Sequence, residues 1–154
     1  MILYLVRHGE AKSEKEHKAR PLSENGVRNV NKVAAHVSRL NITVDRIFHS
    51  SKLRAKQTAE ILAEYLKPSG GVAEAHGLTP LDDPMIWAER LKGETDNTIL
   101  LAGHLPHLSK LASFLLCRNE GRDFISFKPA GMVCLKREDN GTWSLLWMIN
   151  PEIL

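Results

Sequence analysis

The sequence has 154 residues, of which 43% are hydrophobic and 25% are charged, and these fractions are ordinary for a globular chain that buries a substantial core. Its net charge of +3 suits an anionic substrate but is too small and too dispersed to indicate a nucleic-acid-binding protein. The apolar run before Arg7 is too short for a secretory signal peptide, and no apolar stretch is long enough to span a membrane. We therefore expect residues 1–154 to form a single domain of a monomeric, cytoplasmic protein.

The first predicted element is an unbroken apolar run over residues 2–6, which is typical of a short strand buried on both faces. This run leads directly into Arg7, His8 and Gly9. Ligands of open α/β sheets bind at the carboxyl ends of strands. These three residues would therefore bring a fixed positive charge, a nucleophile or base and a permissive backbone position to one point. Arg-His-Gly also occurs in ordinary surface loops, so the interpretation depends on what later segments bring to the same edge.

The next segments predict a loop and a helix. Residues 12–20 are highly charged and have no apolar period, which is typical of a solvated loop. Ser23 predicts the N-cap of the helix that follows. We expect the apolar stripe of this helix to lie in the core, and its members are Val27, Val30, Val33, Ala34, Val37 and Leu40.

A second strand is predicted over residues 46–49, and a helix follows it that contains Arg54 in its first turn. The apolar positions of this helix are Ala55, Ala59, Leu62, Tyr65 and Leu66. The start of a helix binds anions well and disfavours a cation unless an anion accompanies it. Arg54 is therefore a candidate phosphate ligand, although a solvated arginine explains this position equally well.

Two short elements are predicted next, a strand over residues 72–75 and a helix from 83 or 84 to 91. A further apolar run over residues 97–102 predicts a strand that ends before Gly103 and His104. Pro106 suits the first turn of a helix. The apolar positions of that helix are Leu108, Leu111, Ala112, Leu115 and Leu116. His104 thus lies, like His8, at the end of a predicted strand.

The last elements are two strands over residues 131–136 and 143–149, joined by an Asp-Asn-Gly sequence that is a strong hairpin signal. Because the earlier strands alternate with helices, we predict a three-layer α/β/α sandwich. Its central sheet should be mostly parallel, with an antiparallel strand pair near the C-terminus. The two cysteines, Cys117 and Cys134, are expected to be buried reduced thiols. His104 and His107 lack a third ligand at metal-site spacing, so no metal site is expected.

Together these motifs identify a family. The chain resembles the histidine phosphatase superfamily, the phosphoglycerate-mutase-like fold, over nearly its whole length. The resemblance rests on motifs that occur in the family's order, namely Arg7-His8-Gly9, Arg20-Pro21-Leu22-Ser23, residues 50–58 and Gly103-His104. The short length and two further segments, 78–80 and 104–106, are most similar to the SixA-type phosphohistidine phosphatases.

The resemblance implies roles for individual residues. His8 would be the nucleophile that takes the phosphoryl group, Arg7 and Arg54 would hold the phosphate oxygens, and His104 would complete the pocket. Arg20 matches a family arginine that borders the pocket. One departure is Ser51, which stands where many members have proline.

A general acid is harder to place. Asp82 and Asp83 follow the 78–80 segment and are possible, and Glu10 and Glu74 are weaker choices. SixA-type proteins resemble this chain in lacking an obvious acid.

The function that the resemblance implies is that of a phosphohistidine phosphatase. The substrate would be a phosphorylated histidine-containing protein domain of a phosphorelay or phosphotransferase system. Two alternatives remain open, namely a small-molecule phosphomonoesterase of the same superfamily and a non-catalytic phosphate-binding module. Covalent catalysis requires a neutral His8, so we expect neighbouring arginines to lower its pKa and one ring nitrogen to donate to a backbone carbonyl. No metal or other cofactor is expected, because the arginines supply the positive charge.

Overall fold

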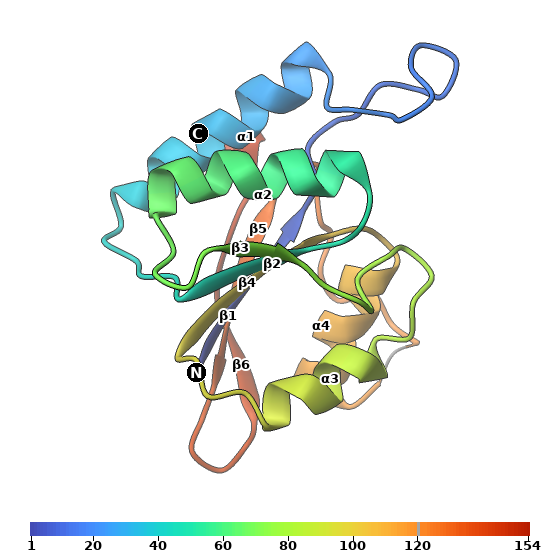
Figure 1. Cartoon of the computed structure of the whole chain (residues 1–154). Helices are drawn as coiled ribbons and strands as arrows, with labels where there is room; N and C mark the ends of the chain where they lie inside the picture. The colour runs from blue at the N-terminus through green and yellow to red at the C-terminus, as the bar shows by residue number, and fades with distance from the viewer. Residues whose placement is uncertain (120) are drawn as a thin grey trace.

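A computed structural model describes residues 1–119 and 121–154, and the strands of this part form one β-sheet (Figure 1). The strands are β1 (Ile2–Arg7), β2 (Arg46–His49), β3 (Val72–Glu74), β4 (Thr98–Gly103), β5 (Met132–Arg137) and β6 (Trp143–Ile149). They lie side by side in the order β3-β2-β4-β1-β5-β6. The first four strands are parallel, whereas β5 is antiparallel to both β1 and β6. The predicted parallel centre with an antiparallel pair near the C-terminus is therefore confirmed.

Helices cover both faces of this sheet (Figure 1). On one face lie α1 (Glu24–Ser38) and α2 (Leu53–Leu66), and on the other lie α3 (Met85–Lys92) and α4 (His107–Cys117). A short 3-10 helix, η1 (Pro151–Ile153), follows β6 and contacts α1. The expected α/β/α sandwich is thus confirmed. No helix among residues 1–119 and 121–154 combines the length and the apolar character needed to cross a bilayer.

The central position of β1 explains its unbroken apolar sequence. Leu3 and Leu5 belong to the core cluster that contains residues of α3 and α4. Tyr4 and Val6 belong to the cluster that contains residues of α1 and α2. Successive side chains of a strand point to opposite faces, so a strand covered on both faces needs an apolar residue at every position.

Helix α1 begins where the sequence predicts, because Ser23 Oγ accepts a hydrogen bond from the backbone N–H of Gly26 at 3.0 Å. Most of the predicted stripe is buried, namely Val30, Val33, Ala34 and Val37. The prediction is wrong for Val27 and Leu40, which are 40% and 46% exposed. Leu40 lies beyond the end of the helix. In the first turn Gly26 faces the protein instead, and a Cβ there would lie 2.0 Å from the carbonyl oxygen of Glu10.

The predictions for the cysteines, Pro106 and the hairpin are confirmed in part. Cys134 is buried as predicted, but the prediction is wrong for Cys117, the last residue of α4, which is exposed. Pro106 immediately precedes α4 and does not lie within its first turn. The Asp-Asn-Gly hairpin is confirmed, with Gly141 at φ +83° between β5 and β6.

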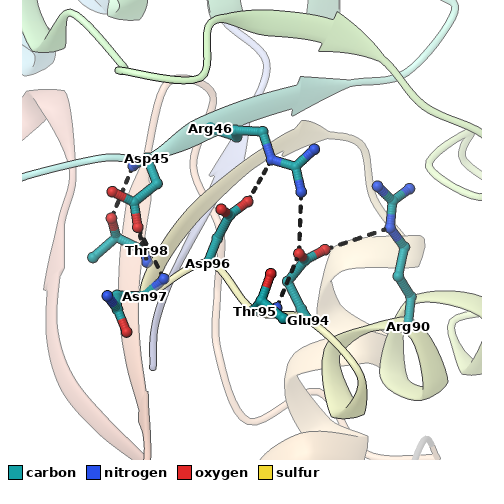
Figure 2. Close-up of polar contacts among 8 residues, drawn as sticks. All are labelled: Asp45, Arg46, Arg90, Glu94, Thr95, Asp96, Asn97 and Thr98. Atoms are coloured by element: carbon teal, nitrogen blue, oxygen red, sulfur yellow. Dashed lines mark hydrogen bonds and ion pairs between the residues drawn. The ribbon is translucent and has the colours of Figure 1, made fainter.

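A polar cluster fixes the register of β2 against β4 at their amino ends (Figure 2). The carboxylate of Asp45 accepts hydrogen bonds from the backbone N–H groups of Asn97 and Thr98, both at 2.9 Å. Arg46 forms an ion pair with Glu94 at 3.1 Å. These contacts hold the two strands at one edge of the sheet, so the residues that leave the opposite edge are also placed relative to each other.

Candidate active site

The candidate site lies at the carboxyl edge of the parallel strands. Arg7 is the register partner of Gly103 across β1 and β4, so His8 and His104 leave the sheet side by side. The backbone N–H of His8 donates to the Gly103 carbonyl at 3.0 Å. On the other side of β1, the N–H of Ala130 donates to the carbonyls of Arg7 and His8 at 3.1 and 3.2 Å. The backbone of His8 is therefore held by β4 on one side and by the turn before β5 on the other.

The ring of His8 is held in one tautomer. Nδ1 lies 2.7 Å from the carbonyl oxygen of Gly9 and donates to it, as predicted from the sequence. Nε2 accepts a hydrogen bond from Arg54 Nε at 3.3 Å, so its lone pair faces the arginine. The pKa of His8 is lowered to about 4, first by burial and then by the charges of Arg54, Arg7 and Arg20, against the opposing effect of the Gly9 hydrogen bond. The predicted direction is confirmed, but burial outweighs the arginines that the sequence suggested as the cause.

The guanidinium group of Arg7 has one paired and one unpaired nitrogen in the described residues. Its Nη1 donates to the carbonyl of Phe127 at 2.8 Å, and burial lowers its pKa. Its Nε is buried and has no hydrogen-bond partner in the described residues. Arg7 also lines a cavity of about 470 Å³ together with Leu105, Asp123 and Lys128, and in the described residues this lining includes neither His8 nor Arg54. A guanidinium keeps its charge and offers a planar set of donors that matches the oxygens of an anionic group.

Arg54 is the second residue of α2, as the sequence predicts. The N-cap residue, Lys52, makes no side-chain hydrogen bond to the helix. Burial lowers the pKa of Arg54, and the charge of Arg20 lowers it further. The charge of Arg20 also lowers the pKa of His8, and Arg20 Nε donates to the Lys12 carbonyl at 3.1 Å.

Two residues of the same motif tie α2 to the chain around His8. Thr58 is fully buried, its hydroxyl donates to the Arg54 carbonyl at 2.8 Å, and its oxygen accepts the Gly9 N–H at 3.1 Å. Gln57 Oε1 accepts the backbone N–H of Leu22 at 2.8 Å. Both residues belong to the 50–58 motif, but no role could be predicted for them from the sequence, because Gly9 and Leu22 are distant along the chain.

His104 is 1% exposed, and its ring centroid lies 4.9 Å from that of His8. Its Nε2 lies 2.5 Å from the hydroxyl oxygen of Ser50, another fully buried residue to which the sequence assigned no role. Its Nδ1 is buried without a partner in the described part of the chain. The pKa of His104 is lowered to about 3, chiefly by burial and next by His8 and Arg54.

The carboxylates considered as a general acid are engaged elsewhere. Asp82 accepts the backbone N–H of Thr79 at 2.8 Å, and the side chain and backbone of Thr79 together lower its pKa. Asp83 accepts the N–H of Met85 at 2.9 Å at the start of α3. A carboxyl whose pKa is lowered holds its proton poorly, so Asp82 is ill suited to donate one at neutral pH.

The two weaker choices are placed no better. Glu10 accepts hydrogen bonds from Ser23 Oγ at 2.8 Å and Asn25 Nδ2 at 3.0 Å, and these contacts lower its pKa. Glu74 is exposed at the end of β3 and lines a hollow of about 320 Å³ with Ser51, Asp82 and residues of the 75–79 segment. In the described residues, the lining of this hollow includes neither of the paired histidines His8 and His104.

His107 is fully buried behind the site, and neither of its ring nitrogens is in hydrogen-bond geometry with a described residue. Burial lowers its pKa, although nearby Asp82 and Asp83 and the Gly77 backbone act in the opposite direction. Residues 1–119 and 121–154 contain no group of three or more His, Cys, Asp or Glu side chains placed to bind a metal ion.

Comparisons with known proteins point to one family. The family model of the histidine phosphatase superfamily (branch 1) matches residues 3–78. A protein of Picosynechococcus sp., itself named as uncharacterized, is 34% identical over 143 residues, which cover 88% of this chain and 85% of the relative. The phosphohistidine phosphatase SixA of Escherichia coli is 26% identical over 155 residues, covering 98% of this chain and 94% of that protein.

Solved structures agree on the fold. A structure of the protein histidine phosphatase SixA complexed with tungstate superimposes with a TM-score of 0.87, at 24% identity and over 99% of both chains. At this identity the likeness establishes the architecture of the chain and leaves its substrate open.

Proposed function

Because this chain belongs to the histidine phosphatase superfamily, which indicates a phosphatase, we propose that it hydrolyses phosphohistidine in a protein through a phosphorylated His8. The observation that carries this proposal is the state of the His8 ring. Nδ1–H is committed to the Gly9 carbonyl, and Nε2 therefore carries a lone pair at the carboxyl edge of the sheet. A neutral imidazole with an unprotonated ring nitrogen is the form that attacks phosphorus.

The neighbouring charges support this role. In the absence of substrate, Arg54 donates to the same Nε2 that would attack. When a phosphoryl group arrives, its oxygens would take over this donor, because they carry negative charge and match the guanidinium geometry. Arg7, with its unpaired buried Nε, would bind a second oxygen. Two fixed cations thus replace the charge that a metal ion supplies in other phosphoryl-transfer sites, so we propose that no metal is needed.

The proposed reaction has two steps. In the first, Nε2 of His8 forms a bond to phosphorus while the bond between phosphorus and the substrate imidazole breaks, and the substrate imidazole leaves as a neutral ring that keeps its own proton. In the second, water attacks the phosphoryl group on His8, which releases inorganic phosphate and restores neutral His8. Division of one difficult step into two easier ones is the general gain of covalent catalysis.

The lack of a suitable acid supports phosphohistidine over an ester as substrate. An alkoxide leaves phosphorus poorly unless a group protonates it, whereas a phosphohistidine ring can carry a proton and leave as neutral imidazole. The hydrogen bond from Thr79 and the lowered pKa of Asp82 argue against that carboxyl as a proton donor. Together with the similarity to a phosphohistidine phosphatase, this preference supports a proposed protein substrate of the phosphorelay or phosphotransferase type.

A direct comparison of substrates tests the proposal. The purified chain is assayed with a phosphohistidine-bearing protein domain and with a panel of alkyl and aryl phosphates, and kcat/KM is measured for each. We expect the phosphohistidine protein to be the best substrate and the alkyl phosphates to be the worst. Comparable or higher kcat/KM for alkyl phosphates would establish a small-molecule phosphomonoesterase. Oxyanion binding without turnover of any substrate would establish a phosphate-binding module.

A further inference from the structure

The hydroxyl of Ser50 lies between His104 and the start of α2. Ser50 is the residue after β2, is fully buried, and has its Oγ 2.5 Å from His104 Nε2. The same oxygen accepts the backbone N–H of Lys52 at 3.3 Å. In the described residues these are the two hydrogen-bond contacts of the Ser50 hydroxyl.

Hydrogen-bond accounting distinguishes the two neutral tautomers of His104. If Nε2 carried the proton, it would donate to Ser50 Oγ, and the Ser50 O–H would have no acceptor among the described residues, while the Nδ1 lone pair would also be unpaired. If Nδ1 carries the proton, the Ser50 O–H donates to Nε2 and Oγ accepts from Lys52. Only the Nδ1–H is then unpaired. Buried polar groups without partners are costly, so the second arrangement is favoured.

We propose that Ser50 is a positioning residue that donates its hydroxyl to Nε2 of His104 and so holds this histidine in the Nδ1–H tautomer. The ring then presents a buried, unpaired N–H donor within a site whose other donors are Arg7 and Arg54. A phosphoryl oxygen is an acceptor, so it pairs with an N–H and is repelled by a lone pair. Because burial keeps the ring neutral, only one of its two nitrogens carries a proton, and the tautomer decides which nitrogen can donate to the phosphoryl oxygen.

This inference deepens the proposed function and rests on it where it assigns the phosphoryl group as the acceptor. The tautomer itself is a property of the free protein. It is measured without substrate, so a test can contradict the role of Ser50 without contradicting the proposed activity, and the reverse also holds. If the chain shows the expected tautomer but does not turn over phosphohistidine, the proposed function fails alone. If it turns over phosphohistidine with Nε2–H in the free protein, the role of Ser50 fails alone.

The first measurement is the ¹⁵N chemical shift of each ring nitrogen in the ¹⁵N-labelled full chain at neutral pH. We expect Nδ1 of His104 to have the shift of a protonated nitrogen and Nε2 that of an unprotonated one. In Ser50→Ala the two shifts should move toward each other, because the tautomers then interconvert. His8 serves as an internal control, since its Nδ1–H is held by Gly9 and should not change. Protonated Nε2 in the unmodified chain, or unchanged shifts in Ser50→Ala, would overturn the inference.

The second measurement is the affinity for tungstate, used as a phosphate-like oxyanion. Loss of one oriented donor should weaken binding by about tenfold in Ser50→Ala. Ser50→Thr keeps the hydroxyl and should retain most of the affinity. Ser51→Ala is the matched control, because Ser51 is exposed and adjacent in the chain. Equal affinity in Ser50→Ala and Ser51→Ala would contradict the role of the buried hydroxyl.

A pair of variants at His104 identifies the nitrogen that meets the anion. The amide nitrogen of an asparagine can occupy the position of Nδ1, and that of a glutamine the position of Nε2. We therefore expect His104→Asn to bind tungstate more tightly than His104→Gln. The opposite order would show that Nε2 is the donor to the anion, and the proposed tautomer would then be wrong.

Discussion

His8 and His104 follow two residues that are register partners in adjacent parallel strands, Arg7 of β1 and Gly103 of β4, and their ring centroids lie 4.9 Å apart. The pairing of the strands therefore brings together two histidines that are separated by most of the chain. Both rings are neutral at neutral pH, with pKa values lowered to about 4 and about 3, so their proximity involves no repulsion between cations. Because the two rings are neutral, neither of them repels a cation such as Arg54 beside the site.

His8 should become transiently phosphorylated, because Nδ1 carries the proton of the ring and Nε2 is therefore the nucleophilic nitrogen. Rapid quench with labelled phosphohistidine substrate should trap an adduct that is labile to acid and stable to base. The adduct should disappear in His8→Ala and persist in His17→Ala, which alters an exposed histidine. Full turnover by His8→Ala would remove His8 from the mechanism.

Arg54→Ala should lower kcat/KM by about 10²–10³, the usual effect of removing one oriented donor to a transition-state oxyanion. Its thermal unfolding should barely shift, because Arg54 makes a single side-chain hydrogen bond, to His8, in the described residues. Lys56→Ala on the same helix is the control, since Lys56 is exposed and its ion pair with Glu60 spans 3.8 Å. Similar kinetics for the two variants would place the anion site elsewhere.

Activity should fall on acidification through about pH 4, because protonation of His8 removes the nucleophilic lone pair. In Arg54→Ala this titration should move to higher pH, since the Arg54 charge lowers the pKa of His8.

The free energy of unfolding should also decrease as pH falls from about 6.5 to about 4, because in this range the unfolded chain binds a proton that folded His8 does not. NMR titration of the His8 ring in both proteins, together with kcat/KM against pH, checks the first two points, and denaturant unfolding at a series of pH values checks the third. A His8 ring that titrates near its ordinary pKa would contradict them.

The leaving-group dependence should reveal whether a general acid acts. Across phosphate compounds whose leaving groups rise in pKa, kcat/KM should decline steeply, because Asp82 is held as a carboxylate by Thr79. Asp82→Asn and Asp83→Asn should leave the slope unchanged. A shallow series that becomes steep in one variant would identify that aspartate as the acid and move the protein toward the small-ester phosphatases.

Thr58→Val should lower both stability and activity. The change leaves the Gly9 N–H unpaired and frees the first turn of α2, at a cost of about 1–3 kcal/mol in the free energy of unfolding. Thr58→Ser should restore both properties. Asp45→Ala is the matched control, because it removes two backbone hydrogen bonds at the opposite edge of the sheet. That control should lose stability and keep its kcat, and an equal loss of kcat in the two variants would show that Thr58 acts through stability alone.

The layers could be predicted from the sequence because they follow from local pattern, whereas the roles of His8, Arg7, Arg54 and His104 came from the family resemblance and stay predictions. Alternating strands and helices predict parallel pairing, and parallel pairing brings strand ends to one edge. Thr58 and Ser50 could not be assigned roles, because their partners, Gly9 and His104, lie about 50 residues away and no periodicity connects them. Burial was also missed as the main cause of the lowered pKa of His8, since the depth of a loop residue depends on all layers together.

Exposure at the ends of elements was predicted least well. Val27 and Leu40 continue the apolar period of α1, yet one lies in its first turn and the other beyond its end, and both are exposed. Cys117 follows the same rule at the end of α4. The assignments of a single domain, a monomer and a cytoplasmic location stay predictions.

The position of β1 in the sheet also bears on how the chain acquires its fold. Strand β1 is hydrogen-bonded to β4 and β5, and both of these strands lie at residue 98 or later in the chain. The strand that leads into His8 therefore has no pairing strand among residues 8–97. Contacts between residues so distant in sequence form late and slow the folding of a domain. The pocket should therefore assemble in one of the last steps of folding, and partly folded forms that still lack β4 should be inert toward phosphorylated proteins.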